Sequence, residues 1–215
     1  MTKIAPSILA ADLSKINNEV INVDKAGAEY IHIDVMDGRY VPNTSFGPNI
    51  VETLRPLTKK ILDVHLMITP VMPYIKAFID AGADIISFHP EADDNSKTII
   101  ETIKSANCRA GIAIHPNVEI EAIQEFLNDI DLVVVMTVVP GFGGQKFLDT
   151  QLSKINKLYY IRESAKAKFQ IEIDGGINEQ TSKQCIANGA DVLVAGSYIY
   201  EGDESEYKNL INSIR

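Results

Sequence analysis

Short runs of β-branched and other apolar residues recur along the chain, and most are followed by a stretch with helical spacing. In these stretches apolar residues return every three or four positions, as Leu13, Ile16 and Val20 do, which is the period of a helix with one buried face. The runs themselves predict β-strands near residues 4–9, 30–35, 61–67, 84–88, 110–114, 132–138, 169–174 and 192–195.

The alternation of strands and helices predicts one α/β domain over residues 1–215. Runs such as residues 131–138 are apolar on both faces, which is typical of buried parallel strands. Eight strand–helix units average about 27 residues each, which suits a compact (β/α)8 TIM barrel. A doubly wound open sheet would give the same alternation. We favour the barrel because polar residues gather at the C-terminal ends of many different strands.

A short repeated segment supports this interpretation. Residues 26–29, 81–84 and 188–191 read AGAE, AGAD and NGAD, and each stands just before a predicted strand. A glycine at this point can take the left-handed conformation that ends a helix. We therefore expect each of these segments to end a helix and turn the chain into the next strand.

Composition and charge exclude several classes of protein. The chain is 46% hydrophobic and 23% charged, which is ordinary for a globular domain. No apolar run approaches the roughly 18 residues of a membrane span, and the chain start shows no secretory or transit pattern, so we expect a cytoplasmic protein without a membrane partner. With a net charge of −9 and no basic run, we expect no nucleic-acid partner. Two cysteines are too few for a disulfide framework.

Two histidines and two aspartates are expected to meet inside the barrel. Side chains alternate along a strand, so His32 and Asp34 share one face of the second strand, His65 faces inward from the third, and Asp174 from the seventh. Buried carboxylates are very costly unless something neutralises them. Each residue could instead be a hydrogen-bonded core residue, but four converging at strand ends favour one divalent ion per subunit: zinc, iron(II), cobalt or manganese.

Three methionines share faces with these residues. Met36, Met67 and Met136 lie on the inward faces of the second, third and sixth strands. They can form a polarisable, water-poor cap over a planar intermediate, or simply fill gaps in the core. The sequence leaves both interpretations open.

Further polar residues lie near the same strand ends. Asp63 and Glu172 stand one inward step below His65 and Asp174, and we favour a role in orienting the ligands over a simple polar layer. His89 and His115 end the fourth and fifth strands, where we favour hydrogen-bonded structural histidines over additional metal ligands.

Glycines follow three successive strands. Residues 141–144 follow the sixth strand, Gly175 and Gly176 the seventh, and Gly196 and Ser197 the eighth. In barrel enzymes the last loops on this rim commonly bind phosphate through backbone N–H groups, which glycine leaves accessible. The pattern predicts a site for a phosphate monoester, and the segment 141–144 is a candidate lid.

Several of these segments together resemble the ribulose-phosphate 3-epimerase family. They read IAPSILAADL, HIDVMDGRYVPNTSFGP, DVHLM, FHPEA, VMTVVPGFGGQKF, IEIDGGIN and ADVLVAGS, and they run from residue 4 to about residue 197. The resemblance implies a metal-dependent (β/α)8 barrel of carbohydrate metabolism, an isomerase that interconverts ribulose 5-phosphate and xylulose 5-phosphate. It also implies a homo-oligomer that assembles through its outer helices.

The resemblance also implies roles for individual residues. The metal ligands would be His32, Asp34, His65 and Asp174, with Asp34 and Asp174 as the acid/base pair on either side of an enediolate. Asp34 would accept the proton in the ribulose-to-xylulose direction. Ser7 and His65 would contact the sugar. The phosphate end would be lined by Gly141, Phe142, Gly143, Gly144, Gly175, Gly176, Gly196 and Ser197.

Other functions remain open at this stage. Val139 and His115 depart from the family pattern near the rim, which leaves a hexulose 6-phosphate such as allulose 6-phosphate as the alternative substrate. The GFGGQ, DGGIN and AGS motifs favour the pentulose. A metal-dependent hydrolase would rarely need three glycine sites for phosphate. A non-enzymatic sugar-phosphate sensor would not need all four candidate ligands.

Overall fold

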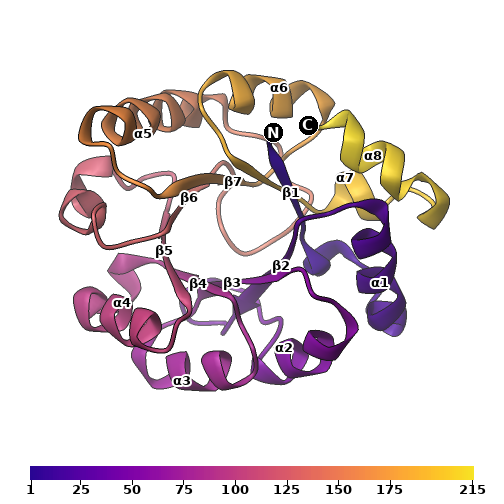
Figure 1. Cartoon of the computed structure of the whole chain (residues 1–215), viewed down its shortest axis with the longest axis horizontal. Coiled ribbons are helices and arrows are strands. Elements are labelled where there is room, and N and C mark those ends of the chain that lie inside the picture. The colour runs from indigo at the N-terminus through magenta and orange to yellow at the C-terminus, as the bar shows by residue number, and fades with distance from the viewer.

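The computed structural model describes residues 1–215 and forms a ring of eight parallel strands, with helices around the outside (Figure 1). The predicted (β/α)8 barrel is confirmed: neighbours in the sheet follow the order β1-β8-β7-β6-β5-β4-β3-β2. The strands are β1 (Lys3–Pro6), β2 (Tyr30–Met36), β3 (Ile61–Met67), β4 (Ile85–Phe88), β5 (Arg109–Ile114), β6 (Leu132–Met136), β7 (Gln170–Asp174) and β8 (Val192–Ala195).

The helices lie between strands in sequence, except that two follow β8. They are α1 (Ile16–Ala26), α2 (Pro48–Leu54), α3 (Met72–Asp80), α4 (Ser96–Ser105), α5 (Leu152–Ala165), α6 (Glu179–Ala187), α7 (Ser197–Tyr200) and α8 (Tyr207–Ser213). Between β5 and β6 the chain forms a 3-10 helix, Ile120–Phe126, in place of an α-helix. Its buried residues Ile120 and Ile123 are three positions apart, which matches three residues per turn.

The first and last strands of the sheet order meet at a seam between β1 and β2. At one end of the seam, the Glu29 N–H donates to the Ile4 carbonyl at 3.1 Å and the Glu29 carboxylate accepts from the Ile4 N–H at 3.0 Å. At the other end, Ser7 pairs with His32 in an isolated parallel bridge. The seam thus closes the ring and brings Ser7 beside the inward face of β2.

Two strand ends differ from the sequence prediction by two or more residues, and the other differences are of a single residue. The first strand stops at Pro6 rather than continuing to residue 9, because Ser7 caps a 3-10 turn (Ile8–Ala10) and accepts the Leu9 N–H at 3.3 Å. The sixth strand stops at Met136 rather than Val138. Both changes shorten a strand at the rim that bears the polar residues.

Apolar packing is divided between the inside and the outside of the ring. On β2, Ile31, Ile33 and Val35 belong to the large cluster between the sheet and the helices. Residues such as Val134, Met136 and Val194 form a smaller cluster inside the barrel. The predicted alternation is therefore correct, and the polar residues of β2 and β3 replace apolar ones on the inner face.

Glycines end three helices, as the short repeated segment predicted. Gly27, Gly82 and Gly189 have φ values of 101°, 100° and 103°, which lie in the left-handed region. A side chain at Gly189 would also collide with Tyr159, whose ring lies 2.6 Å from the position of the missing Cβ. These positions therefore fix where each helix stops and the next strand begins.

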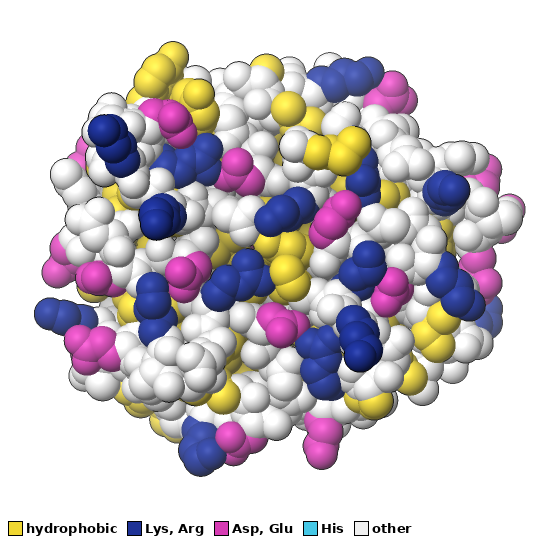
Figure 2. Space-filling view, in the orientation of Figure 1, with side chains coloured by type: hydrophobic (Ala, Val, Ile, Leu, Met, Phe, Trp, Pro, Cys, Tyr) yellow, Lys and Arg dark blue, Asp and Glu magenta, His cyan; other side chains and the backbone are white.

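No helix in the structure has both the length and the apolar composition that a bilayer crossing requires. The face seen in Figure 2 intersperses Lys and Arg with Asp and Glu, so neither sign of charge dominates it.

Candidate metal centre and active site

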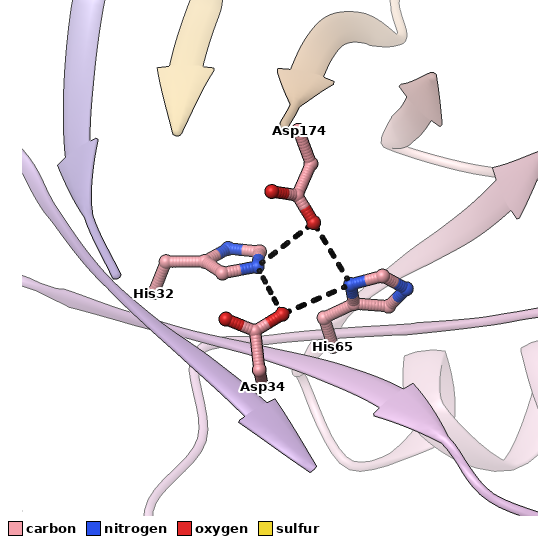
Figure 3. Close-up of side chains that lie close together, drawn as sticks. All are labelled: His32, Asp34, His65 and Asp174. Carbon is pink, nitrogen blue, oxygen red and sulfur yellow. Dashed lines mark ion pairs between the residues drawn. The ribbon is translucent and has the colours of Figure 1, made fainter. Parts of the chain in front are cut away.

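Four predicted ligand atoms converge on one point inside the barrel (Figure 3). His32 Nε2 lies 3.5 Å from Asp34 Oδ1 and 3.7 Å from Asp174 Oδ2. His65 Nδ1 lies 3.6 Å and 3.4 Å from the same two oxygens. All four atoms lie within 4.8 Å of one another.

The barrel places these side chains from two sides. In the β2–β3 ladder Asp34 stands beside His65 and His32 lies two residues before Asp34, so the alternation of the two strands delivers three of the residues to the inner face of the barrel. Asp174 ends β7, which lies on the far side of the ring between β6 and β8. Figure 3 shows Asp174 facing the other three side chains from a separate strand. Closure of the barrel is therefore what completes the cluster.

The cluster has the donor set and the spacing of a metal site. His32 Nε2 and His65 Nδ1 are fully buried and have no hydrogen-bond partner. Four donors arranged tetrahedrally about 2.1 Å from a metal ion stand about 3.4 Å apart, close to the observed 3.4–3.7 Å. Two imidazoles and two carboxylates suit zinc and related divalent metals. The cluster is therefore able to bind a metal ion.

Charge interactions in the cluster outweigh the effect of burial. Burial by itself raises the pKa of Asp34, but the imidazoles of His32 and His65 hold that pKa below its ordinary value. Burial by itself lowers the pKa of His32, but Asp34 and Asp63 hold that pKa well above its ordinary value. The histidines and the aspartates thus favour each other's charged forms.

The two histidines have different partners on their outer nitrogens. His32 Nδ1 lies 2.7 Å from Asp63 Oδ2 and 3.5 Å from Glu172 Oε1. His65 Nε2 lies 3.0 Å from His89 Nε2. The sequence placed Asp63 under His65, but the β2–β3 register sets it beside His32. The sequence interpretation missed the contact of His89 with His65. Side chains alternate along β4, so if Ser87 faces inward, His89 two residues later faces inward as well. That alternation could have suggested the contact.

Two serines hold Asp34 in position. The Ser7 hydroxyl donates to Asp34 Oδ2 at 2.5 Å, and the Ser45 hydroxyl donates to the Asp34 carbonyl at 2.5 Å. Ser45 also accepts the Met36 N–H at 3.0 Å. Ser45 lies in the loop after β2, and no motif in the sequence had indicated its role.

An open cavity lies directly above the cluster. His32 and His65 lie beneath it, and Asp34 and Asp174 reach its floor. Of the residues predicted to bind substrate or cap it, the cavity is lined by Ser7, Met36, Met67, Met136, Gly141, Phe142, Gly143, Gly144, Gly175, Gly176, Gly196 and Ser197. Neither Val139 nor His115, the two departures from the family pattern, lines it.

The three methionines form part of the wall close to the metal cluster. Met36 and Met67 are paired in the β2–β3 ladder, and Met136 comes from β6. Their exposed fractions are 5%, 1% and 2%, so little of each side chain reaches solvent. The methionines therefore form an apolar part of the wall beside the cluster.

The opposite wall is made largely of glycine backbone. A Cβ at Gly176, where φ is +67°, would lie 2.7 Å from the Phe147 backbone nitrogen. A Cβ at Gly143 would meet nothing within 4 Å. The loop itself is braced by Gln145, whose side-chain amide donates to the Val139 and Phe142 carbonyls at 2.6 and 2.7 Å. Sequence reasoning had not assigned that bracing role to Gln145.

Comparison with known proteins decides the family. The model of the ribulose-phosphate 3 epimerase family matches residues 3–200. The chain is 47% identical to the ribulose-phosphate 3-epimerase of Bacillus subtilis over 216 residues, covering 100% of this chain and 99% of that protein. The chain belongs to the ribulose-phosphate 3-epimerase family. It is therefore an isomerase, and the family prediction is confirmed.

A second relative supports the family, and two solved structures support the fold. The Rhodobacter capsulatus ribulose-phosphate 3-epimerase is 44% identical over 93% of this chain and 86% of its own length. Among solved structures, 3-hexulose-6-phosphate synthase from Salmonella typhimurium superposes with a TM-score of 0.73 at 19% identity, covering 99% of this chain and 96% of that one. KGPDC from Streptococcus mutans gives a TM-score of 0.74 at 17% identity, covering 100% and 95%. At these identities the two structures support the barrel fold alone.

Proposed function

We propose that this member of the epimerase family interconverts ribulose 5-phosphate and xylulose 5-phosphate. The observation that carries the proposal is the pair of aspartates, Asp34 from β2 and Asp174 from β7, on the floor of one cavity above two buried imidazoles without hydrogen-bond partners. Inverting the carbon next to a ketone needs a base on one face of the substrate and an acid on the other. Two carboxylates from opposite sides of the ring meet that requirement.

The proton transfer is assigned to particular oxygens. Asp34 Oδ1 and Asp174 Oδ2 point into the four-atom cluster. The other two oxygens, Asp34 Oδ2 and Asp174 Oδ1, are therefore available to accept and donate protons. In the ribulose-to-xylulose direction Asp34 removes the C3 proton, which leaves a planar enediolate, and protonated Asp174 returns a proton to the opposite face of C3. The reverse reaction exchanges the two roles. The short hydrogen bond from Ser7 keeps Asp34 Oδ2 oriented for this step.

His32, Asp34, His65 and Asp174 would hold one divalent ion per subunit, with zinc, iron(II), cobalt and manganese as the candidates. A bound ion of this kind would act as a Lewis acid that stabilises the negative charge developing on the substrate oxygens. The three methionines would exclude water from the planar intermediate. Removing the metal with a chelator should abolish epimerisation, and metal analysis with readdition of each ion identifies the native one.

The glycine wall is proposed to bind the substrate's phosphate. Backbone N–H groups of the loops after β6, β7 and β8 line this side of the cavity, where they can hold a phosphate without any lysine or arginine. Binding energy from a group that does not react can position C3 between the aspartates. A pentulose without phosphate should therefore lose turnover as well as affinity.

The deciding experiment follows C3 in heavy water. Incubation with ribulose 5-phosphate should place deuterium at C3 and form xylulose 5-phosphate without any bond cleavage. Release of inorganic phosphate would instead point to a hydrolase. Faster turnover of allulose 6-phosphate than of the pentulose phosphates would replace the substrate with a hexulose.

Three wider expectations accompany the proposal. The chain should behave as one domain over residues 1–215, assemble as a homo-oligomer through its outer helices, and act in the cytoplasm. Sedimentation velocity checks the assembly, and a monomer at micromolar concentration would contradict it.

A further inference from the structure

The outer nitrogen of His65 has a partner that no part of the proposed reaction uses. His65 Nε2 and His89 Nε2 are 3.0 Å apart, and both side chains are fully buried. Two imidazole nitrogens at this distance share one proton, because two bare lone pairs repel each other and two N–H groups collide. The position of that proton decides which nitrogen of His65 is free to bind a metal ion.

Only one of the two arrangements leaves the cation site open. If His65 keeps its proton on Nε2 and donates it to His89, then His65 Nδ1 presents a lone pair to the cluster. In the reverse arrangement His89 donates, and a neutral His65 carries its proton on Nδ1, where it faces Asp34 and Asp174 and blocks a cation. The hydrogen bond with His89 therefore decides whether His65 Nδ1 can bind a metal ion.

The surroundings of His89 favour the open arrangement. His89 Nδ1 has no hydrogen-bond partner, and the Glu91 carboxylate lies beside it, with Oε1 at 3.6 Å. This distance is longer than a hydrogen bond but close enough for a carboxylate to attract an N–H and repel a lone pair. Glu91 thus favours a proton on His89 Nδ1, which leaves His89 Nε2 as the acceptor for His65.

Tyr40 contacts both Glu91 and His89. Its hydroxyl donates to Glu91 Oε1 at 2.9 Å, and its ring lies 4.8 Å from the His89 ring with an interplanar angle of 34°. Tyr40 lies in the loop after β2 and His89 directly after β4, so two separate loops close over the contact. The Glu91 carboxylate, although partly exposed, is therefore held beside His89 by the hydrogen bond from Tyr40.

We propose that His89 and Glu91 are positioning residues for the cation site: His89 accepts the Nε2–H of His65, and Glu91 attracts the Nδ1–H of His89. The inference rests on the proposed metal site and extends it to residues that touch neither metal nor substrate. It makes the two histidine ligands unlike, because His32 is oriented directly by the Asp63 carboxylate whereas His65 is oriented through a neutral imidazole.

The test measures metal affinity, which is separate from epimerase activity. Zn²⁺ and Co²⁺ affinities are measured by competition with a chromophoric chelator. His89→Phe keeps the ring against Tyr40 but removes the acceptor, and loss of such an outer partner weakens metal binding by about 10- to 100-fold. His89→Gln restores an acceptor oxygen and should return most of the affinity. Glu91→Gln should weaken it by a smaller factor than His89→Phe.

His115→Gln is the matched control, because it removes another histidine from the end of a neighbouring strand without touching the ligands. Its metal affinity should equal that of the wild type. A folded His89→Phe protein that binds both ions as tightly as the wild type overturns the inference. If the wild type binds metal but does not epimerise, while His89→Phe loses affinity, the proposed function fails and the positioning role stands.

A second measurement needs no variant. The chain has four histidines, so long-range ¹H–¹⁵N spectra of the labelled Zn²⁺-loaded protein can assign each tautomer. We expect His65 to carry its proton on Nε2 and His89 to carry its only ring proton on Nδ1. A proton on His89 Nε2, or a wild-type protein that binds neither ion, overturns the inference even if His89→Phe fails to fold.

Discussion

The floor of the cavity and its glycine-rich wall are built from different parts of the chain. The floor around the metal cluster consists of side chains that β2, β3 and β7 project inward, and some of them are held by further contacts, such as Ser7 to Asp34 and Asp63 to His32. The proposed phosphate wall consists of loop backbone after β6, β7 and β8. Charged groups that must stand at fixed distances thus come from rigid strands, whereas loops supply N–H groups that only small residues leave accessible.

This difference determines what a substitution does on each side. On the floor, an exchange of similar size preserves packing and removes one chemical function. On the glycine wall, any added side chain first meets the steric limits of the backbone. Turnover should therefore be sensitive to the floor, and folding together with substrate affinity should be sensitive to the wall.

The largest effect is expected from Asp34→Asn. The exchange keeps the shape of the side chain but removes the base and one anionic donor of the cluster. Because proton transfer by a placed group contributes typically about 10²–10⁴-fold, kcat should fall by about 10³-fold or more. Steady-state kinetics with ribulose 5-phosphate measures the loss, and deuterium incorporation at C3 should fall with it. A variant with near-normal kcat would remove Asp34 from the acid/base pair.

A smaller effect, on stability, is expected from Gly176→Ala. The new Cβ would lie 2.7 Å from the Phe147 backbone at a φ of +67°, so the backbone must shift. Strain of this kind typically costs about 2–4 kcal/mol of unfolding free energy, which at this chain length lowers Tm by about 5–10 °C. Thermal unfolding followed by circular dichroism gives the value.

Gly143→Ala is its matched control on the same wall. Its Cβ meets nothing within 4 Å and its φ lies outside the left-handed region. Its Tm should stay within about 1–2 °C of the wild type, since surface changes stay within about 0.5 kcal/mol. Equal losses of Tm in the two variants would mean that the contact with Phe147 does not matter.

The smallest effect is expected from Ser7→Ala on the floor. The variant removes one hydrogen bond to Asp34 Oδ2 and leaves all four cluster residues in place. A hydrogen bond to a charged group contributes about 1.5–3 kcal/mol, so kcat should fall by about 10- to 100-fold, and Tm should also fall because the same bond stabilises the fold. If the variant changed KM alone, Ser7 would be assigned to sugar binding rather than to holding the base.

The sequence predicted the strands and their inward faces well, for a local reason. Along β2, apolar Ile33 and Val35 alternate with polar His32 and Asp34, and this two-residue period holds whichever strands become neighbours. The glycines at 27, 82 and 189 were predictable for the same reason, because a left-handed residue ends a helix without reference to distant parts of the chain.

Other features depended on contacts that no local pattern contains. The first strand ends early because Ser7 turns inward as a cap and reaches Asp34 across the β1–β2 seam. Asp63 orients His32 rather than His65 because of the register between β2 and β3.

The order of residues along the chain thus set which side chains face the barrel axis and where each helix stops, because backbone geometry alone imposes those periods. Only the closed ring decided that Asp174 lies opposite Asp34, and only the pairing of β3 with β4 decided that His89 meets His65. Distances between side chains on separate strands depend on strand order, register and closure, which arise when the whole barrel packs.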